Sequence, residues 1–132
     1  MPTLEYFLVA RDFSVDQRTN RVSIFNIMEE IHAREFPITI PNMVILCSWN
    51  AENGDNERDF QMTLRPSLDG RPVGIPQPLA HNFRIPGRRC RNFVAVEGLP
   101  LAGPGRLLVE LLLNGDHVAS HTIDVVRDAL EE

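Results

Sequence analysis

The sequence has no lysine and no long apolar run, and its start has no export signal. All 13 basic residues are arginine. Because this bias covers the whole chain, we interpret it as codon usage in a GC-rich genome rather than as a local preference for bidentate anion binding. No stretch approaches the roughly 18 apolar residues of a membrane-spanning helix. Residues Met1–Glu5 lack the basic and apolar regions of a secretory signal. These absences predict a cytoplasmic protein with no membrane contact.

Cysteine is scarce as well, with two residues, Cys47 and Cys90. Each lies in or beside an apolar run, where a free thiol usually behaves as a small buried hydrophobic group. Neither belongs to a Cys-x-x-Cys pair, and without an export signal a disulfide is not expected. The sequence therefore predicts two free thiols and no zinc or redox chemistry.

Catalytic and metal-binding signatures are missing. No serine lies in a Gly-x-Ser-x-Gly turn. His117 and His121 lie in a predicted strand, where a spacing of four residues corresponds to about 13 Å, too far for both to bind one metal ion. The acidic loop 52–59 lacks the spacing of a calcium-binding loop. We therefore predict that the protein is not an enzyme, with no catalytic residue, metal ligand or cofactor.

What the chain does contain is a series of short β-type runs. Its 132 residues are 43% hydrophobic and 23% charged, as in one soluble domain, and ten prolines and eight glycines punctuate them. We predict one domain over residues 1–125 and a short acidic tail over 126–132. Eight strands are expected at Leu4–Asp12, Arg21–His32, Met43–Asn50, Asp59–Arg65, Leu79–Ile85, Arg91–Glu97, Arg106–Leu113 and His117–Val125.

The local signals differ in strength. In Asp59–Arg65, apolar residues alternate with polar ones, and Asn114-Gly115 is the dipeptide of a type I′ hairpin turn. Arg21–His32 also carries a helical stripe, but its branched and aromatic residues favour a bulged strand. Proline is expected to break the chain at Phe36–Pro41, to keep 72–78 irregular or at a sheet edge, and to make 99–105 a loop.

Many short strands without a confident long helix predict an all-β protein. The expected architecture is a two-sheet antiparallel β-sandwich of about eight strands with an immunoglobulin-like Greek key, and a small barrel is the second choice.

Parts of the sequence resemble a family of small bacterial proteins known only as a domain of unknown function. The resemblance lies in Tyr6–Arg11, in Thr19–Ile31 with the following Phe36-Pro37, in Pro104-Gly105 and in the closing hairpin Leu111–Val118. It implies an immunoglobulin-like β-sandwich over nearly the whole chain. It implies no activity, so it assigns no functional residue.

Four arginines cluster around Pro86-Gly87 in a chain whose net charge is −5: Arg84, Arg88, Arg89 and Arg91. If this segment is a hairpin tip, their guanidinium groups project from one end of the domain. Such a cluster suits a phosphate, a carboxylate or an acidic partner surface. Nucleic acid is not expected as a partner, because the rest of the chain is acidic and no aromatic residues interleave the arginines.

A second unusual surface is apolar. Leu107-Leu108 and Leu111–Leu113 place leucines on both faces of one strand, and Phe25, Ile27 and Met28 do the same earlier. Either other segments of the chain cover the surplus, or it forms a homodimer interface. We therefore predict a non-enzymatic protein-interaction or self-association module, with an unknown protein or a second copy as partner. The alternative is a domain that binds small anions at Arg84–Arg91.

Overall fold

The computed structural model describes residues 1–75 and 79–129, which form ten β-strands and a 3₁₀ helix at Asp55–Glu57. The strands are β1 (Thr3–Val15), β2 (Val22–Ile27), β3 (Glu30–Ala33), β4 (Ile38–Asn50), β5 (Phe60–Leu68), β6 (Arg71–Pro72), β7 (Ala80–Phe83), β8 (Arg89–Leu101), β9 (Gly105–Leu113) and β10 (Asp116–Arg127). The all-β prediction is confirmed, with ten strands in place of about eight.

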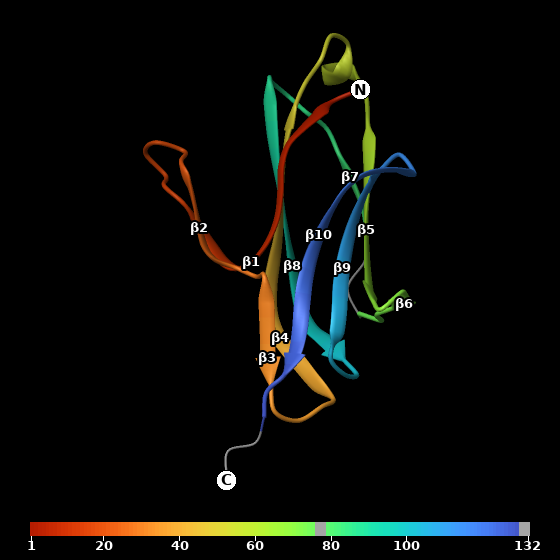
Figure 1. Cartoon of the computed structure of the whole chain (residues 1–132). Helices are drawn as coiled ribbons and strands as arrows, with labels where there is room; N and C mark the ends of the chain where they lie inside the picture. The colour runs from red at the N-terminus through yellow and green to blue at the C-terminus, as the bar shows by residue number, and fades with distance from the viewer. Residues whose placement is uncertain (76–78, 130–132) are drawn as a thin grey trace.

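The strands form two sheets that pack face to face, so the predicted sandwich is confirmed (Figure 1). The first sheet has the order β2-β1-β4-β8, and the second has the order β3-β10-β9-β5-β6, with β7 also paired to β5. One of the described pairs departs from the antiparallel expectation, because β3 runs parallel to β10.

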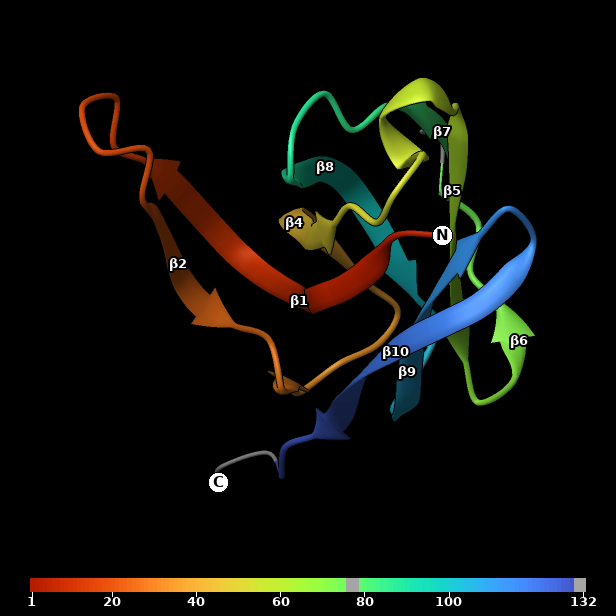
Figure 2. The same ribbon diagram turned by 90° about the horizontal axis from the view of Figure 1, so that it is seen from above.

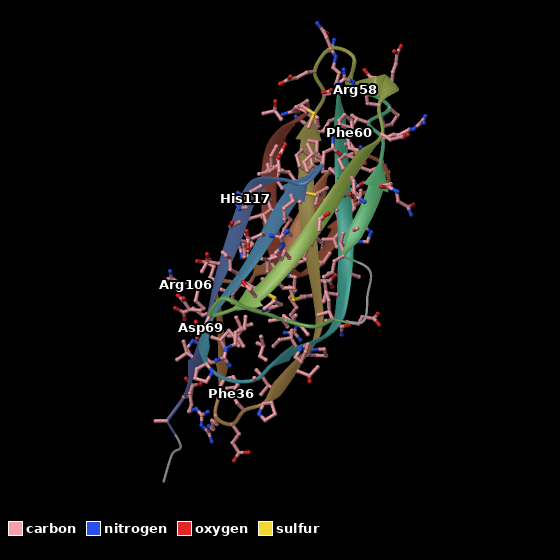
Figure 3. The ribbon with its side chains drawn as sticks, turned by 90° about the vertical axis from the view of Figure 1, so that its right-hand side faces the viewer. Phe36, Arg58, Phe60, Asp69, Arg106 and His117 are labelled. Atoms are coloured by element: carbon pink, nitrogen blue, oxygen red, sulfur yellow. The ribbon has the colours of Figure 1, made fainter. Side chains whose placement is uncertain are left out.

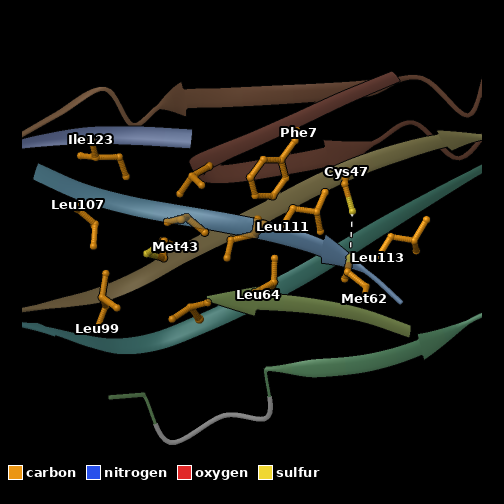
Figure 4. Close-up of a cluster of buried hydrophobic side chains, with 14 of the residues drawn as sticks. Phe7, Met43, Cys47, Met62, Leu64, Leu99, Leu107, Leu111, Leu113 and Ile123 are labelled. Atoms are coloured by element: carbon orange, nitrogen blue, oxygen red, sulfur yellow. Dashed lines mark hydrogen bonds between the residues drawn. The ribbon is translucent and has the colours of Figure 1, made fainter. Parts of the chain in front are cut away.

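The inner faces of both sheets supply the main core. The alternation predicted for β5 is confirmed, since Phe60, Met62 and Leu64 are all buried. Figure 4 shows how β9 places Leu107 and Leu111 against the residues of the facing sheet. Burial of a large aliphatic or aromatic side chain contributes about 1.5–3 kcal/mol, so these alternating faces are the main source of stability.

The segment 21–32 forms strands and not a helix, but it forms two of them. The break lies at Asn26, whose φ of 57° interrupts the strand, and at Met28, whose amide donates a hydrogen bond to the Val9 carbonyl at 2.8 Å. The next residue already belongs to the other sheet, because the Glu29 carbonyl accepts a hydrogen bond from Asp124 at 2.9 Å. The helical stripe of apolar residues in 21–32 therefore reflects a crossing between the two sheets, and not the bulged strand that the sequence predicted.

Two predicted breaks were wrong. β4 begins at Ile38 and continues through Pro41, and β8 continues through Pro100 to Leu101, so the expected loop shrinks to 102–104. Pro41 is tolerated because the pairing of β4 with β1 ends at Val44, which leaves this part of β4 with a strand neighbour on one side only.

The closing hairpin is confirmed at Asn114-Gly115, with positive φ values of 50° and 87°. β10 continues two residues past the predicted domain boundary at 125, because Val126 and Arg127 pair with β3. Residues 130–132 of the predicted acidic tail lie outside the described residues. Of the stretch 72–78, Pro72 ends the two-residue strand β6, and 76–78 are likewise outside the described part.

The turn after β5 is fastened to the start of β9 by Asp69, which Figure 3 labels beside Arg106. The Asp69 carboxylate accepts a hydrogen bond from the Arg106 amide at 2.8 Å, and the Asp69 amide donates to the Arg106 carbonyl at 3.0 Å. Gly105 has a φ of 153°, and a Cβ there would lie 2.2 Å from a carboxylate oxygen of Asp69.

We predict that Gly105→Ala destabilises the fold by roughly 1–3 kcal/mol, because it strains the backbone and displaces the Asp69 carboxylate. Gly103→Ala is the matched control, since a Cβ at Gly103 meets nothing within 4 Å. Urea denaturation measures both free energies of unfolding. Equal stabilities of the two variants would contradict the close approach.

A second prediction concerns His32, whose ring nitrogens lie 2.9 Å from Glu30 Oε2 and 2.8 Å from Asp128 Oδ1. Hydrogen bonds to Glu30, and then to Asp128, raise the pKa of His32 above its usual 6.5. A raised pKa means that the pairing stabilises the fold fully below about pH 6.5 and is lost as the pH rises through the folded-state pKa.

The melting temperature of the native chain should therefore exceed that of His32→Gln by more at about pH 6 than at about pH 9. Differential scanning calorimetry at the two pH values measures this. A difference that is independent of pH would show that the pairing does not depend on the imidazolium charge.

Candidate functional site

The four clustered arginines do not form a hairpin tip. β7 pairs with β5 and β8 pairs with β4, so Pro86-Gly87 connects the two sheets rather than two strands of one sheet. Arg84 is paired with Asp59, and the hydrogen bond and charge of its guanidinium group lower the pKa of that carboxyl. Arg88 faces a separate, smaller cleft that Asn53 and Asn56 also line.

Arg89 and Arg91 do lie together, in a cleft of about 950 Å³ on the outer face of the first sheet. We call it the hairpin cleft, because the β1–β2 hairpin bends away from the body and bounds it on one side (Figure 2). β8 and the end of β4 bound the other side. The residues that line it are Glu5, Tyr6, Thr19, Asn20, Arg21, Val22, Ile24, Ser48, Pro86, Arg89, Cys90, Arg91 and Phe93.

The hairpin loop is held in one conformation by Asp16. The Asp16 carboxylate accepts hydrogen bonds from the amides of Arg18 and Thr19 at 2.8 and 3.2 Å, and these bonds lower its pKa. Asn20 closes the loop with a φ of 59° and an amide hydrogen bond to the Asp16 carbonyl. This geometry presents the Asn20 side chain to β8.

The two cleft arginines are in different electrostatic situations. Arg89 Nε lies 3.0 Å from Glu5 Oε2, so a carboxylate balances its charge. Arg91 Nη2 donates to Asn20 Oδ1 at 2.6 Å, which is a neutral acceptor. The hydrogen bond orients the guanidinium group of Arg91 across the cleft but leaves its positive charge uncompensated by that partner.

A row of three side chains crosses the floor of the cleft. Ser48 is the cross-strand partner of Tyr6 on one side and of Arg91 on the other, so all three lie on the same face of the sheet. Ser48 is fully buried, and its hydroxyl has no hydrogen-bond partner among the described residues. A buried hydroxyl without a partner is uncommon, because it loses its hydration without compensation.

An aromatic pair divides the outer face of this sheet. Phe13 and Phe93 stack with ring centroids 4.3 Å apart and planes at 8°, although β4 lies between their strands. The stack covers a second cluster of buried residues, made by Ala10, Val44 and Leu46. The outer face is therefore curved and partly closed, which makes a cleft out of a flat sheet surface.

The surplus apolar residues separate into two groups. Leu107 and Leu111–Leu113 are buried within the chain, so the sandwich covers most of that strand. Phe25 and Ile27 of β2 are exposed by 48% and 44%. Of these surplus residues, the strongly exposed ones are thus on the projecting hairpin.

The histidines do not gather. His117 Nε2 lies 2.8 Å from Ser120 Oγ, whereas His121 Nε2 lies 2.7 Å from the Met28 carbonyl oxygen. Within residues 1–75 and 79–129, no three His, Cys, Asp or Glu side chains are arranged to hold a metal ion. That part of the chain also has no helix with the length and apolar character needed to cross a membrane.

Sequence reasoning placed Arg89 and Arg91 in the candidate site but missed Tyr6, Asn20 and Ser48. No local signal marks these residues, because the partners that place them in the cleft are far away in the sequence: Ser48 for Tyr6, and Arg91 for Asn20 and Ser48. The one usable hint was the polar Ser48 within the apolar run 43–49, which indicates a hydroxyl inside an otherwise buried strand.

These features define a class: a small two-sheet β-sandwich with an open, partly basic cleft on the outer face of one sheet. The chain belongs to a family of unknown function, DUF6941, whose model matches residues 5–126. No curated protein has a similar sequence.

In fold, the chain is similar to part of the Pseudomonas fluorescens alkylpurine DNA glycosylase AlkC, solved bound to DNA containing an abasic site analog. The TM-score is 0.54 with 11% sequence identity, and the match covers 96% of this chain but 30% of that one. At this identity the likeness concerns the fold alone, and this chain spans less than a third of the glycosylase.

The two cysteines are free thiols, as predicted. Burial raises the pKa of Cys47 to about 12, and the thiol lies 3.3 Å from the Met62 sulfur. Partial burial at the edge of the hairpin cleft also raises the pKa of Cys90.

We predict that Cys47 does not react with a thiol reagent such as DTNB at about pH 8 while the protein is folded, and that Cys90 reacts more slowly than a free cysteine. The Cys90→Ser variant should show no reaction until denaturant is added, and then one thiol per chain. Rapid labelling of folded Cys90→Ser would contradict the burial of Cys47.

Proposed function

We propose that the domain is a non-enzymatic protein-interaction module whose hairpin cleft binds an extended segment of a partner protein that carries acidic and apolar side chains. The observation that carries this proposal is that Arg91 has no carboxylate partner among the described residues. Asn20 holds the guanidinium group with a neutral oxygen at 2.6 Å, so four of its five N–H groups can serve a carboxylate.

The surroundings of Arg91 support an amphipathic ligand rather than a simple ion. Tyr6, Phe93, Val22 and Ile24 give the cleft apolar and aromatic surface, which favours side chains of the same kind. The buried hydroxyl of Ser48, next to Arg91, has no hydrogen-bond partner among the described residues. A carboxylate flanked by apolar side chains matches both features.

We further propose that the domain catalyses no reaction and needs no cofactor. The lack of a catalytic sequence signature and the raised pKa values of both thiols support this, because a nucleophilic cysteine requires a lowered pKa. Nucleic acid is not proposed as a ligand, although the glycosylase of similar fold is bound to DNA, because the net charge of this chain is −5. A cytoplasmic location, bacterial origin and an immunoglobulin-like arrangement stay predictions.

Small-anion binding is the second candidate, and Arg91 is again the observation that favours it. Of the four arginines predicted from the sequence, only Arg89 and Arg91 would then bind the anion. Arg84 is paired with Asp59, and Arg88 faces another cleft. Inorganic phosphate would then bind without any peptide.

The test uses a fluorescent peptide that alternates glutamate with phenylalanine and valine, and a control peptide with lysine in place of glutamate. We predict that the native chain binds the acidic peptide and not the basic one. Arg91→Gln should weaken binding about tenfold or more, because a charged hydrogen bond contributes about 1.5–3 kcal/mol.

Arg84→Gln is the matched control, since it removes an arginine of the same segment outside the cleft, and it should bind like the native chain. If phosphate raises the melting temperature through Arg91 while neither peptide binds, the cleft is an anion site. If Arg91→Gln changes neither the binding of the acidic peptide nor the effect of phosphate on the melting temperature, both candidate functions are wrong.

A further inference from the structure

The exposed edge of β2 is the part of the molecule with the least protection against pairing. β2 is the outermost strand of the first sheet and has β1 as its strand neighbour. Its six residues, Val22–Ile27, carry no charge and no proline, and three of them are β-branched. Phe25 and Ile27 are the exposed apolar side chains noted above. An edge of this composition is a template for another strand.

The other edge strands of the described chain are blunted. β8 carries Arg89, Arg91, Glu97 and Pro100, and its Gly98 has a φ of 75°. β3 has four residues, and Glu30 and His32 in it form ion pairs. β6 is the dipeptide Arg71–Pro72, and β7 has four residues. Charges, proline and short length are the usual devices that prevent edge pairing. β2 has no charge and no proline, and its irregularity is Asn26 near the C-terminal end, with a φ of 57°.

The charges that flank β2 have opposite signs at its two ends. Arg18 and Arg21 precede the strand, and their guanidinium groups have no partner among the described residues. Glu29 and Glu30 follow it. When two copies of such a strand pair antiparallel, the basic end of each lies beside the acidic end of the other. Parallel pairing would instead place like charges together.

We propose that two copies of this chain associate by antiparallel pairing of their β2 strands about a two-fold axis, which joins their four-stranded sheets into one sheet of eight strands. A pairing centred between Ile24 and Phe25 places Arg21 opposite Met28 of the partner subunit and next to the partner's Glu29. It also covers the exposed side chains of Phe25 and Ile27. The partner at this edge is therefore a second copy of the chain, and the charges at the two ends of β2 favour antiparallel over parallel pairing.

This interface is distinct from the hairpin cleft. Edge pairing uses the backbone of β2, whereas the cleft opens on the outer face of the same sheet. The two-fold axis of an antiparallel pair is perpendicular to the sheet, so both clefts of the dimer open to the same side. The dimer would therefore be a divalent module with two clefts on one side. A partner that carries two binding segments would bind it more tightly than a single cleft, because the first contact raises the effective concentration of the second segment.

The first test is sedimentation equilibrium of the full chain and of two exposed-site variants. Phe25→Lys puts a charge on the proposed edge, and Val118→Lys puts the same charge on an exposed residue of β10. We expect the native chain and Val118→Lys to dimerise equally, and Phe25→Lys to raise the dissociation constant at least tenfold with unchanged circular dichroism. A native chain that is monomeric at every concentration measured, or a dimer insensitive to Phe25→Lys, overturns the proposal.

A charge exchange tests the direction of pairing. Arg21→Glu should weaken the dimer, and the double variant Arg21→Glu/Glu29→Arg should restore it. The two positions are separated by a six-residue strand, which spans about 20 Å, so the rescue cannot come from a contact within one chain. Failure of the double variant to recover rules out the antiparallel arrangement. Peptide binding is measured on Phe25→Lys, because Phe25 does not line the hairpin cleft whereas Arg21 does. Loss of the dimer and loss of the cleft are thereby told apart.

Discussion

Residues Met43–Trp49 of β4 are buried on both faces, and this is the constraint from which the rest of the structure follows. The inner face contributes Met43, Ile45, Cys47 and Trp49 to the core between the sheets. The outer face carries Val44, Leu46 and Ser48, which also have to be removed from water. In a two-sheet sandwich the second sheet covers the inner face only, so the outer face needs a separate cover.

That cover is the reason the molecule has a cleft. The β1–β2 hairpin bends away from the body, but its base still covers part of the outer face, because Val22 and Ile24 pack against Val44 and Leu46. The stack of Phe13 on Phe93 covers the same cluster. Beyond the stack the cover ends, and the space between hairpin and β8 remains open. Ser48 lies where the cover and the opening meet, and its buried hydroxyl has no hydrogen-bond partner among the described residues. Arg91 and Asn20 then connect the two walls.

The same hairpin produces the exposed edge. Because β2 covers the outer face from the margin of the sheet, its far side has no described strand neighbour. The hairpin thus has two roles in one sequence segment: Val22 and Ile24 pack against the second cluster, and Phe25 and Ile27 extend into solvent. The similarity to part of a much larger glycosylase concerns the fold alone. The cleft and the exposed edge are argued from the residues of this chain.

The sequence by itself determined the all-β class, the buried face of β5 and the turn at Asn114-Gly115, because each depends on alternation or on the backbone preferences of adjacent residues. It did not predict that 21–32 divides between two sheets, or that β4 and β8 continue through proline, because those outcomes depend on which strand lies alongside. Likewise, only the tertiary structure decided which arginines share a site. Arg84 and Arg91 are seven residues apart, yet their partners, Asp59 and Asn20, come from different parts of the chain and direct them to different surfaces.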